Sequence, residues 1–429
     1  MPAPAFSRRT LLGSLAALGL VTALPACSPG QPSASTEPLR FTFWGPDFYQ
    51  QFTRQMVDGF TAAHTDVTVS VEPAEWSGYW DRLATQMAAN DEPDVINMDG
   101  KYLAEYAGRG VLADLEALDG LDLSGIAPND LDAGRVDGKL AAVSTGQNAW
   151  VILANPDLFE KAGVDLPDDK TWTWDDFSSL ATKITESKAA TGFSGGGSYA
   201  DLTIFLRQRG EDLWSANALG ATPEALTAWY QLYLDLQTAK ATLSAQGSVE
   251  DGAASLEAQA FPTGKTAMSW AWTNQLASIR EASGSDKITM LRPPSTGGSV
   301  ETNGLFGKAT MFWSVAARSK QQDQAASLVN YLLNDPDANK IQLVNRGVPS
   351  NPAAIEAMSG DLTATDKEVV AFMQEVLAEI TSTPTVQPVG TSDAQNTFTR
   401  YLTEVRFQRI TPAAAAEATI KEVNAMVQV

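Results

Sequence analysis

Strand-like and helix-like patterns alternate along this chain from residue 39 onward, and no other feature limits its possible folds as strongly. The stretch 39–44 (LRFTFW) alternates as a strand does, and apolar residues at helical spacing follow it over 52–60. A second alternating stretch covers 67–71 (VTVSV), and 93–98 (PDVINM) has the composition of a short buried strand. Strands that alternate with helices build largely parallel sheets covered by helices. We therefore expect an α/β fold.

A second α/β unit is expected to start near Trp150. Residues 151–153 (VIL) have the composition of a strand, and so does the segment 266–272 (TAMSWAW). Between them, Thr173 can cap a helix whose first turn carries acidic residues, which complement the helix dipole. Without its first 26 residues the chain still has about 400 residues, which is too long for one small core. We therefore expect two lobes.

The segment 1–26 has the features of a signal peptide. Arg8 and Arg9 stand near the N-terminus, and the apolar stretch 11–26 has the length of a signal-peptide core and is short for a membrane span. Residues 24–27 (LPAC) resemble a lipobox, in which Cys27 receives a diacylglyceryl group and becomes the mature N-terminus. The paired arginines resemble a twin-arginine signal, and a general secretory signal is the alternative.

Cysteine usage supports lipidation at Cys27. This residue is the only cysteine in the sequence, so it can form no intramolecular disulfide. The alternative is an ordinary secretory signal with a chance cysteine near its end. Residues 28–38 (SPGQPSASTEP) have no apolar surface to bury, so we expect 27–38 to be a disordered, lipid-anchored linker. It would hold the folded part at the outer face of the cell membrane.

The charge balance excludes several functions. The formal net charge is −21 at pH 7, so phosphate backbones and anionic lipid surfaces would repel the chain. Anionic ligands are also disfavoured, unless a local basic pocket overrides the overall field. With one cysteine and one histidine, His64, the chain has too few ligands for a transition-metal site. We expect no cofactor and no nucleic-acid partner.

Aromatic and acidic residues follow the predicted strands, where open α/β sheets bind ligands. Trp44 ends the first strand. Glu75 and Trp76 follow the second strand, and Asp99 follows the third. Aromatic rings stack on the apolar faces of sugars, and carboxylates accept hydrogen bonds from sugar hydroxyls. Core packing is the alternative for Trp44, and helix capping is the alternative for Asp99.

Six short segments occur in a fixed order over residues 39–350. They are Phe43-Trp44-Gly45, 92–112 (EPDVINMDGKYLAEYAGRGVL), 137–140 (DGKL), 154–164 (ANPDLFEKAGV), 261–268 (FPTGKTAM), and 314–333 (SVAARSKQQDQAASLVNYLL) with Gly347-Val348-Pro349 after it. Together they resemble the extracellular solute-binding proteins of family 1, which serve carbohydrate ABC importers. The chain departs from the family pattern at 150–155 (WVILAN), where the usual aromatic residue before the asparagine is missing.

The resemblance implies a two-lobe, periplasmic-binding-protein-like α/β fold with a hinge and a ligand cleft between the lobes. Lobe 1 would comprise 39–146 and 307–350, and lobe 2 would comprise 147–306 and 351–429. Further candidate ligand-binding residues lie at the crossover between the lobes, after the strand 266–272, and at the rim of the cleft: Gln147 and Asn148; Trp272 and Asn274; Trp313, Gly304 and Arg346.

The resemblance also implies a mechanism. The lobes would close about the hinge on a carbohydrate, and the membrane subunits of an ABC importer would then recognise the closed form. The number of candidate tryptophans in both lobes favours an oligosaccharide or glycoside, since each ring could stack on one sugar. The protein is expected to act as a monomer and to have no enzymatic activity.

Two alternatives stay open. One is a secreted carbohydrate-active enzyme that uses two carboxylates, since acidic residues are plentiful. Against it, the chain has no GxSxG or HExxH motif and no GxGxxG motif between a strand and a helix. The other alternative keeps the fold but binds a peptide, a polyamine or an anion. Paired tryptophans favour a sugar over these ligands.

Overall fold

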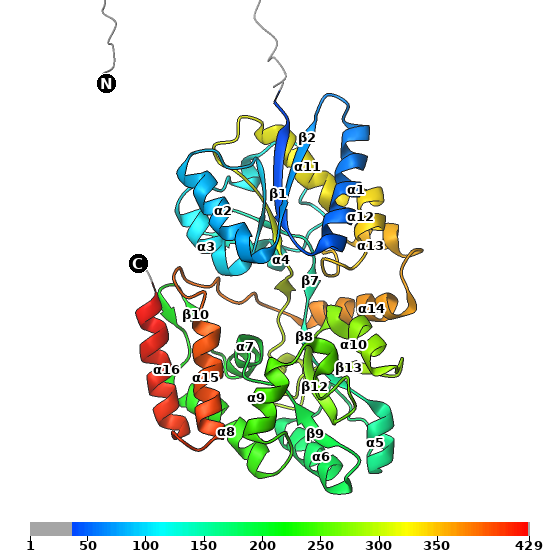
Figure 1. The fold of residues 1–429 in the computed structure, drawn as a ribbon, viewed down its shortest axis with the longest axis vertical. Helices are drawn as coiled ribbons and strands as arrows, with labels where there is room; N and C mark the ends of the chain where they lie inside the picture. Colours follow the sequence, from blue (N-terminus) through cyan, green and yellow to red (C-terminus); the bar gives the residue numbers. More distant parts are fainter. Residues whose placement is uncertain (1–36, 428–429) are drawn as a thin grey trace, which may run out of the picture. The chain divides into compact units, whose positions relative to one another are not determined.

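A computed structural model describes residues 37–427 (Figure 1). All of the described residues belong to one unit of the chain. The predicted signal peptide, Cys27 and the linker as far as residue 36 lie outside the described residues. None of the described helices is both long enough and apolar enough to cross a membrane.

A mixed sheet of five strands, in the order β2-β1-β3-β15-β6, forms the centre of the first lobe, called lobe 1 below. β1 pairs in parallel with β2 and β3, whereas β15 runs antiparallel to both of its neighbours, β3 and β6. Almost every residue of β1 is buried, as expected for a strand covered on both faces. The strands are β1 (Leu39–Trp44), β2 (Val69–Ala74), β3 (Val95–Met98), β6 (Val143–Ser144) and β15 (Phe312–Val315).

Two groups of helices cover this sheet (Figure 1). α1 packs against α11 and α12, and α2 packs against β1. The buried side chains of the two groups form separate apolar clusters. The helices are α1 (Asp47–Ala63), α2 (Trp76–Ala88), α3 (Gly100–Gly108), α4 (Pro128–Asp132), α11 (Gln322–Asn334), α12 (Pro336–Gln342) and α13 (Pro352–Met358).

The second lobe, lobe 2, contains a four-stranded sheet in the order β13-β8-β12-β9. β8 pairs antiparallel with β12 and β13, and β9 pairs in parallel with β12. These strands are β8 (Trp150–Ala154), β9 (Thr191–Ser194), β12 (Thr266–Trp272) and β13 (Thr289–Leu291). Alternation of sheets and helices in both lobes confirms the predicted α/β class.

The helices of lobe 2 come from two parts of the chain, because α16 near the C-terminus packs on α8 (Figure 1). The prediction that Thr173 caps a helix is confirmed: its hydroxyl accepts from Asp176 N at 3.3 Å, and Asp176 accepts from Thr173 N at 2.9 Å. The helices are α5 (Pro156–Ala162), α6 (Trp174–Ser187), α7 (Tyr199–Arg207), α8 (Pro223–Thr238), α9 (Ala245–Ala253), α10 (Leu276–Ser283), α14 (Ala364–Glu379), α15 (Ala394–Arg406) and α16 (Pro412–Met426).

Short elements complete the described chain. Asp137 and Gly138 both have positive φ values, 50° and 80°, as a tight two-residue hairpin turn between β4 and β5 requires. These elements are β4 (Arg135–Val136), β5 (Lys139–Leu140), β10 (Trp214–Ser215), β11 (Ala218–Leu219), and the 3₁₀ turns η1 (Leu115–Ala117), η2 (Leu256–Ala258), η3 (Thr273–Gln275) and η4 (Val300–Thr302).

Two antiparallel strands, β7 (Gln147–Asn148) and β14 (Lys308–Ala309), link the lobes. A third connection leads from α13 to α14. α13 lies beyond residue 350, where lobe 1 was predicted to end, yet it packs against α12 of lobe 1. The third connection therefore follows α13.

Candidate ligand-binding site

An aromatic cluster stands at the carboxyl end of β1 and β2 in lobe 1. The ring of Trp44 meets Trp76 at 5.2 Å and Tyr79 at 5.0 Å, both edge-to-face. Trp44 is only 8% exposed, whereas Trp76 is 38% exposed. Trp44 is therefore the buried support of the cluster, and Trp76 is the ring that can receive a ligand.

The first turn of α3 borders this cluster. The Tyr102 ring lies 3.9 Å from that of Trp80, and the Lys101 ammonium stands 4.7 Å above the ring of Trp76. Asp99 caps α3 by accepting a hydrogen bond from Lys101 N at 3.0 Å. Burial, together with the charge of Asp99, raises the pKa of Tyr102. Capping, the alternative weighed for Asp99, is thus observed, and its charge also acts on neighbouring side chains.

A second aromatic group stands at the end of β12 in lobe 2. The Trp272 ring lies 4.8 Å from Trp150 and 6.5 Å from Tyr199. Trp272 and Tyr199 are half-buried, so each keeps some surface for a ligand. Trp270 on the same strand is 6% exposed and donates to Tyr233 at 3.3 Å, which makes it a core residue.

Asp99, beside the aromatic cluster of lobe 1, interacts electrostatically with two residues beside the aromatic group of lobe 2. Burial and the charge of Asp99 raise the pKa of Tyr199, although the two residues belong to different lobes. Burial lowers the pKa of Lys308 on β14, and Asp99 partly offsets this effect. The Lys308 ammonium also lies 5.5 Å from the centre of the Trp272 ring. Lys308 and Tyr199 therefore both lie beside the Trp272 ring, and the charge of Asp99 acts on each of them.

A glycine loop positions Tyr199. Gly195, Gly196 and Gly197 have φ values of 87°, 93° and 91°, which other residues rarely adopt. A Cβ on Gly196 would come within 2.2 Å of the Tyr233 ring, so the backbone must pass at glycine distance.

Buried Asp201 holds the end of this loop. Its carboxylate accepts from Gly197 N at 3.2 Å, Ser198 N at 2.7 Å and the Tyr233 hydroxyl at 2.7 Å. Burial raises the pKa of Asp201 to about 6, and these hydrogen bonds limit the rise.

This two-lobe arrangement matches a known family. The family model of the bacterial extracellular solute-binding proteins matches residues 46–339, more than half of the chain. The chain belongs to this family. Its members are solute-binding proteins rather than enzymes, and they are extracellular.

Individual relatives in the family differ in how much of the chain they match. An uncharacterized lipoprotein in the oleD 5′ region of Streptomyces antibioticus is 30% identical over 40% of this chain and 39% of its own length. The diacetylchitobiose binding protein DasA of Streptomyces coelicolor is 24% identical over 83% of this chain and 85% of its own. An extracellular solute-binding protein of family 1 from Alicyclobacillus acidocaldarius has a solved structure with a TM-score of 0.77. It is 24% identical and covers 92% of this chain and 100% of its own, which shows a shared fold.

The two residues predicted at the crossover between the lobes are buried in the present structure. Gln147 and Asn148 are 1% and 4% exposed. The Asn148 amide donates to Thr310 Oγ1 at 2.8 Å and accepts from Thr273 Oγ1 at 3.3 Å. The side chain of Asn148 therefore forms its hydrogen bonds with residues of the hinge region. The remaining predicted polar residues, Glu75 and Asn274, are exposed, each next to one of the aromatic groups.

The predicted rim residues lie in packed regions. Trp313 is fully buried in the core of lobe 1, with its ring 5.3 Å from Phe41 and 4.9 Å from the guanidinium of Arg346. Arg346 is also fully buried. A Cβ on Gly304 would lie 2.4 Å from the carbonyl oxygen of Ile204, so this glycine serves close backbone packing. Neither Trp313 nor Arg346 offers a surface to a ligand in this structure, because both side chains are packed into the core of lobe 1.

Sequence reasoning missed several residues beside the two aromatic groups: Lys101, Tyr102, Tyr199 and Lys308. Lys101 and Tyr102 come shortly after β3. Their position after a strand was a usable signal, as it was for Trp76. Tyr199 and Lys308 gave no such signal, because a loop and a hinge strand bring them to the site.

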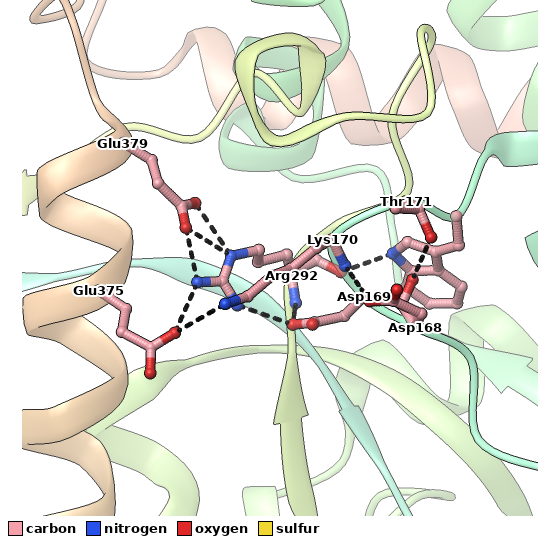
Figure 2. Close-up of polar contacts among 8 residues, drawn as sticks. Asp168, Asp169, Lys170, Thr171, Arg292, Glu375 and Glu379 are labelled. Atoms are coloured by element: carbon pink, nitrogen blue, oxygen red, sulfur yellow. Dashed lines mark hydrogen bonds and ion pairs between the residues drawn. The ribbon is translucent and has the colours of Figure 1, made fainter.

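A buried charge cluster in lobe 2 was also missed (Figure 2). Arg292 follows β13, and its guanidinium binds Glu379 at 2.7 Å, Asp169 at 3.1 Å and Glu375 at 3.1 Å. Its partners come from α14 and from the loop before α6. Every side of this cation is paired, so the cluster fastens α14 to the lobe and is no ligand site. In the part of the chain that the structure describes, no group of acidic, histidine or cysteine side chains could hold a metal ion.

Proposed function

We propose that this protein is the exported, lipid-anchored substrate-binding component of an ABC importer and that it captures a carbohydrate. The ligand class is an oligosaccharide or glycoside. The proposal combines family membership with the chemistry of the two aromatic groups, and it assigns the protein no catalytic role.

The pair of aromatic platforms with some exposed surface supports the proposal. Trp76 in lobe 1 follows β2, and Trp272 in lobe 2 is the last residue of β12; each has an exposed polar residue near it in the sequence, Glu75 and Asn274 respectively. Two separated rings suit a ligand with more than one sugar ring, because each platform stacks on one apolar face. DasA, a relative that matches 83% of this chain, is by name a diacetylchitobiose binding protein, which supports a sugar ligand.

Hinge closure is the proposed mechanism. Ligand would first stack on one platform and then draw the other lobe onto its free side. The linking strands β7 and β14 have only two residues each, so changes in a few backbone dihedrals can move the lobes. Ligand shifts the equilibrium by the contacts that exist only in the closed form. The membrane subunits of the importer would recognise that form.

The N-terminal chemistry completes the proposal. Lipidation of Cys27 would anchor the protein to the outer face of the cell membrane, and residues 28–38 would act as the tether. The relative described as a lipoprotein supports this anchoring. One folded unit with its own site would work as a monomer.

A thermal-shift screen against neutral, acidic and amino oligosaccharides tests the proposal. A tight ligand raises the melting temperature by mass action, by an amount that grows with its concentration. Small-angle scattering should then show compaction with the same ligand. A rise with peptides or polyamines alone would overturn the carbohydrate assignment. Product formation from a bound oligosaccharide would overturn the claim that the protein only binds.

A further inference from the structure

A lysine ammonium lies beside the aromatic ring at the end of β12. The Lys308 ammonium is 5.5 Å from the centre of the Trp272 ring. Within residues 37–427 it forms no ion pair, and it donates only to the carbonyl oxygen of Ala309, at 3.1 Å. An ammonium can donate more than one hydrogen bond, so Lys308 keeps donors for a ligand that stacks on Trp272.

The surroundings of Lys308 leave its charge poorly compensated. The backbone holds the residue in place, because Lys308 pairs with Asn148 where β14 meets β7. Its side chain is half-buried, so the ammonium has lost part of its hydration. Two buried cations of lobe 2, Arg280 and Arg292, are instead paired with carboxylates. Lys308 has no such partner in the described part of the chain, so a ligand that supplies one would be stabilised.

The aromatic cluster of lobe 1 also has a lysine beside its exposed ring, but its surroundings are more acidic. The Lys101 ammonium lies 4.7 Å from the centre of the Trp76 ring and 5.2 Å from that of Tyr102. Burial raises the pKa of Tyr102, and so do the charges of four carboxylates, those of Asp81, Asp99, Glu105 and Asp393. Among the described residues, only the carboxylate of Asp99 has a comparable effect on Lys308, from beyond the distance of an ion pair. A ligand carboxylate is therefore favoured at Trp272 and opposed at Trp76.

The chemistry of the ammonium limits what fits at Trp272. A hydroxyl can accept a hydrogen bond from Lys308, but a carboxylate also neutralises its charge and therefore binds more strongly. A ligand ammonium would be repelled. In a uronic acid the carboxyl group is attached to the edge of the sugar ring, so the apolar face of the ring can still stack on Trp272. The flexible stem of Lys308 allows its ammonium to reach that edge.

We infer that Lys308 and Trp272 form a subsite for an acidic sugar ring, in which Trp272 stacks on the ring and Lys308 binds its carboxylate. The inference rests on the proposed function and narrows its ligand class to oligosaccharides or glycosides that contain a uronic acid. The subsite also explains how a chain with a net charge of −21 can bind an anion, because an unpaired ammonium acts at short range.

Calorimetry with matched ligands tests the subsite. Cellobiouronic acid is compared with its methyl ester, which keeps the acceptor oxygens without the charge, and with cellobiose; a different sugar found in the screen is compared in the same three forms. The wild type should bind the acid about 10-fold more tightly than the ester or the neutral sugar. Lys308→Met should remove this preference. Lys308→Gln should remove it as well, because glutamine keeps a hydrogen-bond donor but not the charge.

Two other lysine variants separate the subsite from the effect of net charge. Lys287→Met removes the same charge at an exposed ion pair with Asp157 and should leave all affinities unchanged. Lys101→Met removes the ammonium beside Trp76 and should leave the preference for the acid over the ester unchanged. Melting temperatures check that each variant folds.

Each result decides a different question. If no carbohydrate binds the wild type, the proposed function fails. If a neutral sugar or ester binds the wild type as tightly as its acid, the acidic subsite is overturned while sugar binding stands. The same holds if both Lys308 variants keep the preference for the acid, or if Lys101→Met removes it.

Discussion

Two aspartates occupy the same position in two helix caps of lobe 2, and their surroundings should give them opposite effects on stability. Asp201 is the third helical residue of α7, and Asp176 is the third helical residue of α6; each accepts from the N-cap backbone. Asp201 is buried, whereas Asp176 is exposed. Replacing each by asparagine removes its titration and retains an amide of similar size.

The magnitude for Asp201 follows from its pKa. Burial raises the pKa from an ordinary value of 3.8 to about 6. Between these values the folded state binds more protons than the unfolded state, so stability falls as pH rises. The difference corresponds to about 3 kcal/mol between pH values below about 4 and above about 7. Relative to Asp201→Asn, the wild type should therefore gain about 3 kcal/mol of unfolding free energy on acidification.

Asp176 should behave in the opposite way. Hydrogen bonds from Thr173 lower its pKa, so its contribution to stability is present at neutral pH and is lost on acidification. Relative to Asp176→Asn, the wild type should lose stability as the pH falls through the lowered pKa of Asp176.

Chemical denaturation of the wild type and both variants over about pH 2.5 to about pH 7.5, which includes the range below the ordinary aspartate pKa, measures these differences. The comparison uses only differences between proteins at one pH, which cancels the titration of all other groups. A pH-independent difference for Asp201→Asn would refute the argument from burial. A common slope for both variants would refute the contrast between the two sites.

Three further predictions follow from other parts of the structure. Trp76→Ala should lower sugar affinity about 10-fold in calorimetry with a small change in melting temperature, whereas Trp313→Ala should cost about 3–5 kcal/mol of unfolding free energy; equal stability losses would contradict their different burial. Arg292→Met should destabilise lobe 2 by about 3 kcal/mol in denaturation, because it leaves the partly buried carboxylates of Asp169 and Glu379 unpaired, and Glu375→Gln at the exposed edge of the cluster by less than about 1 kcal/mol. Cys27→Ser should move the protein from the membrane fraction to the soluble fraction and remove the lipid seen by mass spectrometry; unchanged fractionation would reject the anchor.

The sequence predicted features that depend on local chemistry. The cap at Thr173 was found because a threonine stands directly before a helix whose first turn carries acidic residues. The strands β1, β2, β3, β8 and β12 were found because burial imposes a visible pattern on a few consecutive residues, whereas β6, β9, β13 and β15 were not predicted. Trp44 and Trp76 were selected because the ends of parallel strands meet at one edge of the sheet.

Features that depend on distant pairing could not be predicted in this way. Trp313 and Trp272 are both aromatic residues on strands. Trp313 is buried because Phe41, Arg346 and the rest of the lobe 1 core pack around its ring, whereas Trp272 is the last residue of its strand and is only partly covered. The sequence around either residue gives no information on what packs against its face of the sheet. Lys308 was missed for a related reason, since the pairing of β14 with β7 places it beside Trp272, which a different part of the chain supplies.

The position of β15 also has a consequence for biosynthesis. This strand completes the sheet of lobe 1 between β3 and β6, but the chain reaches it only after most of lobe 2 has been made. Lobe 2 is likewise incomplete until α16, which packs on α8, has been synthesised. Neither lobe can therefore complete its folding while the middle of the chain is being translated. Until β15 is synthesised, β3 and β6 have unpaired edges, which favour aggregation. Folding of this protein should therefore depend on chaperones that bind the incompletely folded chain until its C-terminal helix has been synthesised.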